Sequence, residues 1–392
     1  MATSKKKPIL LAIVSGKGGS GKTTFSLALA ALISKCRLNV ALFDCDFVTN
    51  GGTYFFEQRW SPSDCKHFTT QDYVYGSEEL LYHDDITSKR PFYLVNKYFR
   101  FIPSIYNVPD DYSLETGELT FAGIESFIEE NSIDIVIFDC QAGYSLVTKF
   151  LLDHSTINLV VMEADAISTS ANRVLYKKLA EQFDAKTTYQ IMNKVTEEER
   201  DKYTNLPFGT TFTNLTPVLF DWHIRGCFTL NKLPEIGDDT FNFSIDMCNM
   251  ACILFPMHRE TFRKVILELY IDKRQKIAPA AEAEEKQMRA ERKSENGQLI
   301  IMLSMVFIVA ACAYFLFHSI LASSSDSFLI IGFVILLAIV LAYSYSRSVL
   351  TKERYDYAEY KKRKTFVNDL TIQINELKRE IEFYSDDGIT NR

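Results

Sequence analysis

Gly16-Lys17-Gly18-Gly19-Ser20-Gly21-Lys22-Thr23 is the stretch that decides the fold of this 392-residue chain, because it fits the phosphate-loop pattern G-x-x-x-x-G-K-[ST]. An apolar run at 8–14 precedes it and a helical stretch at 25–34 follows it, which is the context that such a loop requires. In this loop, backbone N–H groups point at phosphate oxygens, the lysine reaches the β- and γ-phosphates, and the hydroxyl ligates Mg²⁺. The sequence therefore predicts a site for a nucleoside triphosphate and Mg²⁺. The candidate nucleotide-binding residues here are Gly16, Lys17, Gly18, Gly19, Ser20, Gly21, Lys22, Thr23 and Thr24.

The extra lysine at position 17 makes the loop more specific. Residues 17–23 resemble KGGxGKT, the deviant Walker A loop of the MinD/ParA family of P-loop ATPases, in the SIMIBI class. In that family the first lysine reaches the nucleotide of the partner subunit. The resemblance, which covers residues 8–234, therefore implies ATP as cofactor and a homodimer that sandwiches it. It also implies ATP hydrolysis that is slow without an activating partner, with Lys17 and Lys22 as catalytic residues.

Apolar runs with β-branched residues recur along the first 200 residues, separated by segments long enough for helices. We expect strands at 8–14, 40–43, 133–138, 157–162 and 188–192. Strands that alternate with helices predict an α/β fold with a doubly wound, mostly parallel sheet covered on both faces.

Carboxylates follow two of these strands. Asp44 and Asp46 end the second strand, and acidic residues at the carboxyl edge of a sheet beside a phosphate loop suit Mg²⁺ binding. Asp46 matches the second aspartate of the family's switch I segment, which implies that it orients the attacking water, with Asp44 as a partner of Mg²⁺. Taken alone, two acids that end a strand could instead be a turn and a helix N-cap, and the phosphate loop upstream favours the magnesium site over that alternative. Asp139 ends a Walker B strand and is expected to hold Mg²⁺ together with Thr23.

The chain differs from the family pattern in the segment after the Walker B strand, and it matches the family at two positions associated with the adenine base. Family members have D-x-P-A-G after the Walker B strand, whereas this chain has Gln141 in place of the proline, which puts the rate of hydrolysis in doubt. Asn193, at the end of another strand, matches the asparagine that binds adenine. Pro234 belongs to a segment that resembles the one packed beside the base.

The charge balance argues against one class of partner, nucleic acid. The first 275 residues contain 28 Lys and Arg against 35 Asp and Glu, so they carry the whole net charge of −7. An acidic domain argues against nonspecific nucleic-acid binding. The eight cysteines show no paired framework, which is typical of proteins from a reducing compartment.

Composition divides the chain into four predicted parts. We expect an ATPase domain at 1–275, a charged helical linker at 276–297, a transmembrane helical hairpin at 298–346, and a cytoplasmic C-terminal helix at 347–392. The hairpin rests on two uncharged stretches, 299–321 and 328–345, each long enough to cross a bilayer. Lys and Arg flank both stretches and are absent between them, so the positive-inside rule places the ATPase domain and the C-terminus in the cytoplasm. The sequence thus predicts a multi-pass protein of the inner (cytoplasmic) membrane, in contact with the lipid bilayer.

Three regions leave alternatives open. Apolar residues between 360 and 384 alternate by three and four, which predicts a short coiled coil with another copy or an unknown protein partner. A single amphipathic helix packed on the ATPase, or lying on the membrane, fits equally well. The aromatic-rich stretch 54–111 is either core or a partner-binding insertion.

The sequence supports three hypotheses about function. A dimerising ATP switch that controls or positions a partner at the membrane face is the leading hypothesis. A bacterial tyrosine autokinase is the alternative, because tyrosines cluster between 343 and 384. A nucleotide-binding scaffold that does not hydrolyse ATP is a third possibility.

Overall fold

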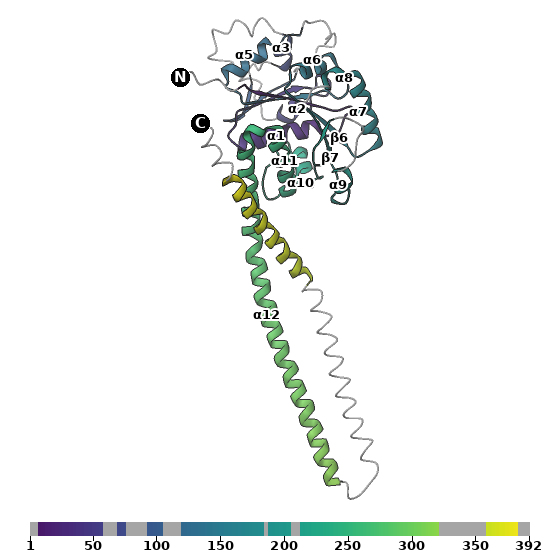
Figure 1. Ribbon diagram of the computed structural model, residues 1–392, viewed down its shortest axis with the longest axis vertical. Coiled ribbons are helices and arrows are strands. Elements are labelled where there is room, and N and C mark those ends of the chain that lie inside the picture. The colour runs from purple at the N-terminus through teal and green to yellow at the C-terminus, as the bar shows by residue number, and fades with distance from the viewer. Residues whose placement is uncertain are drawn as a thin grey trace. The chain divides into compact units, whose positions relative to one another are not determined.

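The computed structural model describes residues 7–57, 69–75, 92–104, 119–183, 187–204, 212–320 and 358–382 (Figure 1). The chain divides into two compact units, with the boundary between Leu269 and Tyr270. The first unit contains a central sheet and its covering helices. The second consists of two helical segments, and each unit is considered by itself.

A mixed, mostly parallel sheet forms the centre of the first unit. In its described part it has eight strands in the order β3-β4-β2-β5-β1-β6-β7-β8, and only β3 runs antiparallel to its neighbour. All five predicted strands are present, and β3, β4 and β8 are additional, with β3 and β8 at the two edges. The bounds are β1 Ile9–Val14, β2 Val40–Cys45, β3 Tyr93–Asn96, β4 Phe99–Ile102, β5 Ile135–Cys140, β6 Ile157–Glu163, β7 Thr188–Asn193 and β8 Thr213–Asn214.

Helices cover both faces of this sheet (Figure 1). On one face, α1 packs against β1, β2, β4 and β5 and also contacts α11, whereas α3, α6 and α7 pack on the other face. The central strands, such as β2 and β5, are buried on both sides, as expected for a parallel sheet between helical layers. The helices are α1 Lys22–Lys35, α2 Gly51–Glu57, α3 Thr70–Tyr75, α5 Ala122–Glu130, α6 Leu146–His154, α7 Ala166–Lys178, α8 Ala180–Phe183, α9 Glu197–Thr204, α10 Trp222–Thr229, α11 Phe241–Leu254, the 3-10 turn η1 Pro256–His258, and α12 Arg259–Ile320.

The described aromatic residues between 54 and 104 belong mainly to the core. Phe56, Phe99 and Phe101 are fully buried, and the Phe56 ring centroid lies 4.5 Å from that of Phe101 and 6.3 Å from that of Phe99. Tyr73 packs edge-to-face on Phe43 of β2, at 5.6 Å. The core interpretation is confirmed for these residues, while 58–68, 76–91 and 105–118 lie outside the described residues.

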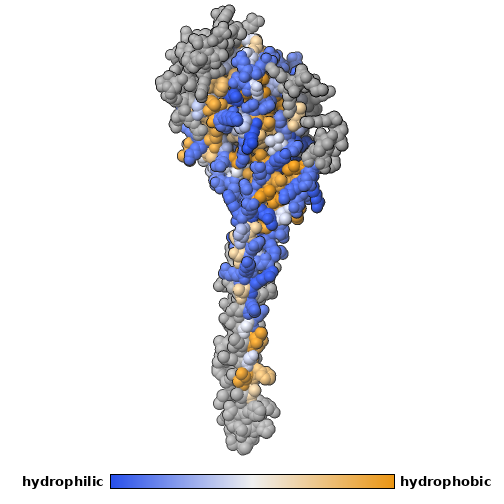
Figure 2. Space-filling view, turned by 90° about the vertical axis from the view of Figure 1, so that its left-hand side faces the viewer, coloured by the Kyte–Doolittle hydropathy of each residue, from blue (hydrophilic) through white to orange (hydrophobic). Residues whose placement is uncertain are grey.

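Helix α12 corrects the expected membrane hairpin. The first predicted span is not a separate element, because its described residues continue a 62-residue helix that begins at Arg259. Ile300, Leu303, Phe307 and Ile308 are exposed on it. Figure 2 shows hydrophobic residues, in orange, at the surface of the molecule. Among the described residues, no helix combines the length and apolar character needed to cross a membrane. The predicted multi-pass location in the inner membrane is therefore wrong, and the second predicted span lies outside the described residues.

The C-terminal helix, residues 358–382, pairs with α12 of the same chain. Arg274 donates to Thr371 Oγ1 at 2.9 Å, and Lys364 lies 3.2 Å from Glu285, so the two helices run antiparallel. The apolar stripe predicted to form a coiled coil is buried at Leu370, Ile374 and Leu377.

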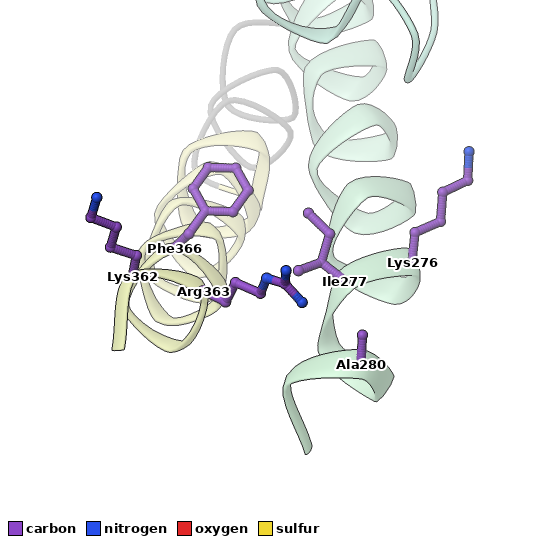
Figure 3. A pocket seen from close by; sticks show the side chains of 6 residues that line it. All are labelled: Lys276, Ile277, Ala280, Lys362, Arg363 and Phe366. Atoms are coloured by element: carbon purple, nitrogen blue, oxygen red, sulfur yellow. The ribbon is translucent and has the colours of Figure 1, made fainter. Parts of the chain in front are cut away.

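A shallow pocket lies beside this pairing. Its lining residues are Lys276, Ile277, Ala280, Lys362, Arg363 and Phe366 (Figure 3). Figure 3 shows Phe366 and Arg363 of one helix next to Ile277 of the other, with the Lys276 and Lys362 amino groups pointing away. Intrachain packing thus takes up the stripe that was expected to join another copy, a partner or a membrane, and the coiled coil with another chain is not supported.

Candidate functional site

The phosphate loop lies at the carboxyl edge of the sheet, between β1 and α1. Strand β1 lies between β5 and β6, so the chain crosses to opposite sides of β1 at this point, where open α/β sheets bind ligands. Helix α1 begins at Lys22, directly after the loop, and its N-terminus adds a partial positive charge there. Gly21 has φ 90°, and a Cβ at this position would lie 2.4 Å from Asn193 Nδ2, so only glycine fits.

Two buried carboxylates face each other across β2 and β5 beside this loop. Asp44 and Asp139 are register partners and are 1% and 2% exposed. Thr53 binds Asp44 Oδ2 through its backbone N–H and its hydroxyl, at 2.7 and 2.8 Å. Among the described residues, neither oxygen of Asp139 has a hydrogen-bond partner, although the hydroxyls of Thr23 and Ser26 lie close enough to favour its charged form.

This arrangement fits a magnesium site. A buried carboxylate without a partner is costly, and a hard cation with oxygen ligands relieves the cost. Within the described residues, no group of three or more His, Cys, Asp or Glu side chains could hold a metal on its own. Mg²⁺ in nucleotide sites takes only one or two protein carboxylates with phosphate and water, so the residue types of Thr23, Asp44 and Asp139 suit it, and their role as ligands stays a prediction.

The buried acids give the protein without nucleotide an unusual pH dependence. Burial raises the pKa of Asp44 to about 7, with a further contribution from Asp139, and burial raises the pKa of Asp139 to about 6. The folded state therefore holds these protons at pH values where the unfolded chain has released them. These two groups consequently lower the free energy of unfolding as pH rises from about 4 to about 7.

Asp139→Asn tests this sign by chemical denaturation of the full chain without metal or nucleotide. The variant should be more stable than wild type by roughly 2 kcal/mol near pH 7, and the difference should shrink towards pH 4. Glu129→Gln, at an exposed acid of α5, is the control and should show no such trend. A variant that loses stability equally at both pH values would contradict the assignment.

Asp46 lies in the same corner, but its carboxylate is engaged by its own loop. Oδ1 accepts from the backbone N–H groups of Val48 and Thr49, at 3.2 and 2.9 Å, and Oδ2 accepts from the Thr49 hydroxyl at 2.6 Å. These are the contacts of the turn interpretation. Orientation of water by Asp46 stays a prediction, and it requires Thr49 to share or release the carboxylate.

Lys17 points away from the loop towards the end of β6. Its Nζ lies 2.9 Å from Glu163 and 3.0 Å from Asp165, and its side chain is 31% exposed. Hydrogen bonds to Glu163 and Asp165 raise the pKa of Lys17, so it stays charged. Within the described part of the chain, this lysine is held by two carboxylates at the rim of the site.

Of the two residues predicted to contact the base, Asn193 bonds to the phosphate loop, and Pro234 lies in the segment that precedes α11. Asn193 Nδ2 donates to Ser20 O at 2.9 Å, so this side chain lies against the phosphate loop. Pro234 lies between α10 and α11 and is buried. The role of Pro234 at the base stays a prediction.

Sequence reasoning missed the residues that hold the outer side of the loop. Lys194, at φ 60°, donates to Gly19 O and to Glu163 Oε1, both at 2.6 Å. Asn172 of α7 accepts from Gly16 N at 2.8 Å. Glu163 and Asp165 could have been found, because acids that end a strand had already been singled out at β2 and β5. Asn172 carries no such signal, since it lies within a helix.

Comparison with solved structures gives similar proteins of low identity. MinD in the MinC:MinD cell division protein complex of Aquifex aeolicus is 15% identical, with 63% of this chain and 96% of that chain covered and a TM-score of 0.48. The septum site-determining protein MinD of Pyrococcus horikoshii OT3, complexed with Mg-ADP, is 15% identical, with 65% and 99% covered and a TM-score of 0.45. A ParA family ATPase from Chlorobium tepidum TLS is 16% identical, with 62% and 99% covered and a TM-score of 0.43.

Sequence comparison is more decisive. No curated protein matches this chain. Residues 11–207, which are half of the chain, match the profile of the CobQ/CobB/MinD/ParA nucleotide binding domain. This match spans the phosphate loop, both acidic strand ends and Asn193. The protein therefore belongs to the CobQ/CobB/MinD/ParA nucleotide-binding family, with a mostly parallel α/β P-loop fold.

Proposed function

We propose that this protein is an ATP-dependent dimerising switch, which binds and hydrolyses ATP with Mg²⁺ and thereby controls or positions a partner protein. The observation that carries the proposal is the convergence of four features at one edge of the sheet: the phosphate loop, the α1 N-terminus, the buried pair Asp44 and Asp139, and a rim lysine. Phosphoryl transfer depends mainly on positioning and on charge neutralisation, and this edge offers both.

Each residue has a proposed task. The loop from Gly16 to Thr24 binds the phosphates, Lys22 neutralises their charge, and Thr23, Asp44 and Asp139 would hold Mg²⁺, which neutralises further charge when bound. Asp46 orients water once Thr49 shares its carboxylate. Asn193 and Pro234 contact the base.

Lys17 supplies the link to dimerisation. In the described structure it is tied to Glu163 and Asp165 and remains partly exposed, so it is charged and lies at the rim. We propose that ATP-bound copies of the chain pair face to face, and that Lys17 then exchanges these carboxylates for the phosphates of the partner copy. Partner proteins would bind selectively to the ATP-bound dimer, and an activating partner would speed hydrolysis.

One observation favours a second candidate, a nucleotide-binding scaffold with little turnover. Both oxygens of Asp46 already accept hydrogen bonds from switch I, so the described arrangement leaves this carboxylate partly occupied. The fate of the γ-phosphate separates the candidates.

The test uses the purified full chain with γ-labelled ATP and Mg²⁺, and Lys22→Ala as control. We expect label to appear slowly as free phosphate and not on protein, because the proposed switch transfers the γ-phosphate to water. Tight binding without phosphate release would favour the scaffold, and label on tyrosine would favour the autokinase.

A further inference from the structure

Asn172 is a fully buried amide that joins α7 to the start of the phosphate loop. Its Oδ1 accepts from Gly16 N at 2.8 Å, and its Nδ2 donates to Ser168 O at 2.8 Å. The side chain is 0% exposed, so water does not compete for either bond. Both functions of the amide are therefore used, one on the loop and one on the helix.

The backbone around Gly16 shows how tightly the loop and α7 are joined. A Cβ at Gly16 would lie 2.3 Å from Ala171 C and 2.5 Å from Asn172 N. The start of the loop thus lies directly on the α7 backbone, and no side chain fits between them. Because Gly16 N donates to Asn172, this amide is committed to holding the loop in place.

The same turn of α7 also arranges the residues that hold Lys17. Ser168 Oγ accepts from Glu163 N at 3.0 Å, and Ser168 N donates to Asp165 Oδ1 at 2.6 Å. Glu163 and Asp165 are the two partners of Lys17. Asn172 therefore bonds directly to Gly16, and through Ser168 it is linked to the two carboxylates that hold Lys17.

We propose that Asn172 is the positioning residue of the phosphate loop: it fixes Gly16 against α7, and nucleotide affinity depends on its amide presenting an acceptor to the loop and a donor to the helix. The inference rests on the proposed nucleotide binding and extends it to a residue that contacts no nucleotide.

The hydrogen bonds allow only one orientation of this amide. Gly16 N–H can only donate and Ser168 O can only accept, so the side chain must offer an oxygen to one and a hydrogen to the other. A protonated aspartic acid meets both demands, whereas an aspartate places a second negative oxygen against Ser168 O. Asn172→Asp should therefore bind nucleotide well when protonated and poorly when ionised.

The direction of the pH effect follows from burial. Burial and the facing Ser168 carbonyl both disfavour the carboxylate, so the pKa of an acid at position 172 is raised. The charged groups of the connected segment act in both directions: Lys17 and Lys194 favour a carboxylate at position 172, whereas Glu163 and Asp165 oppose it. Affinity of the variant should be present below the raised pKa and be lost as pH rises through it.

The experiment measures the affinity of the full-length protein for Mg·ADP and Mg·ATP by calorimetry, from about pH 5.5 to about pH 8.5. Asn172→Asp should bind roughly tenfold to a hundredfold more weakly than wild type at the high end and recover at the low end, as expected for loss of one buried hydrogen bond. Equal affinity of wild type and variant at the high end would overturn the proposal.

Asn158→Asp is the matched control. Asn158 of β6 is also buried, at 2% exposed, and its Nδ2 donates to Gln182 O at 3.2 Å, away from the loop. This variant should lose thermal stability as pH rises but keep the wild-type affinity while it is folded. A parallel loss of affinity in both variants would show a merely structural effect and would contradict the proposal.

Two further measurements keep the outcomes distinct. If Asn172→Asp does not fold at high pH, Asn172→Ala replaces it, and this variant should bind roughly tenfold more weakly at every pH. Unchanged affinity in Asn172→Ala would overturn the proposal. Wild type that binds neither nucleotide would instead refute the proposed function, and the positioning role with it.

Discussion

Lys22→Ala is expected to abolish Mg·ATP binding, with a loss of affinity of at least about a hundredfold. Lys22 is 6% exposed at the first position of α1, and its charge also lowers the pKa of Asp139. Alanine removes the cation that neutralises the phosphates and leaves the buried acids uncompensated. Calorimetry on the full chain measures the effect.

Lys97→Ala is the matched control, because Lys97 is an exposed lysine of the turn between β3 and β4, at the edge of the sheet opposite the phosphate loop. This variant should keep the wild-type affinity for Mg·ATP. Tight binding by a folded Lys22→Ala protein would contradict the assignment of the phosphate site.

Lys17→Ala should separate nucleotide binding from association of two chains. In the described structure, Lys17 contacts Glu163 and Asp165 and does not reach into its own loop, so its removal should change Mg·ATP affinity by no more than about threefold. Because we propose that Lys17 acts on the nucleotide of the partner copy, the ATP-dependent dimer should be lost. Sedimentation of the full chain with Mg·ATP measures this.

Lys149→Ala provides the comparison for Lys17→Ala. Lys149 is an exposed lysine of α6 that pairs with Asp153 one turn away at 3.4 Å, so its loss removes the same charge without touching the site. It should dimerise like wild type. An unchanged dimer in Lys17→Ala would refute the action of Lys17 across the interface, and equal loss in both variants would point to a nonspecific charge effect.

Much of the fold could be predicted from sequence because its signals are local. The five central strands are continuous apolar runs, and the phosphate loop requires a strand before it and a helix after it. The edge strands were missed because β3 and β8 are short and partly exposed, and an exposed edge strand carries little hydrophobic pattern.

The C-terminal half shows where sequence reasoning fails. An apolar run such as 299–321 satisfies a length rule for membrane spans, yet whether it is a separate span depends on what precedes and follows it. Its described residues continue α12. The apolar stripe around Leu370 correctly predicted which face of the C-terminal helix is buried. It did not predict that α12 of the same chain covers this face, because a heptad pattern does not specify the covering helix.

The site was predictable where residue types are chemically unusual. Glycines, a lysine and a hydroxyl in fixed order identify the phosphate loop, and Asp44 and Asp139 follow from strand ends. Asn172 and Lys194 act on backbone groups of the loop, at Gly16 N and Gly19 O, and such contacts depend on tertiary packing that sequence spacing does not reveal.

The most direct test of the central claim is the mass of the wild-type full chain in solution with Mg·ATP and with Mg·ADP, measured by sedimentation equilibrium. The account predicts a dimer with Mg·ATP that returns to the monomer as ATP is converted to ADP. A single mass that is the same with both nucleotides, at concentrations where both are bound, would contradict a nucleotide-dependent switch.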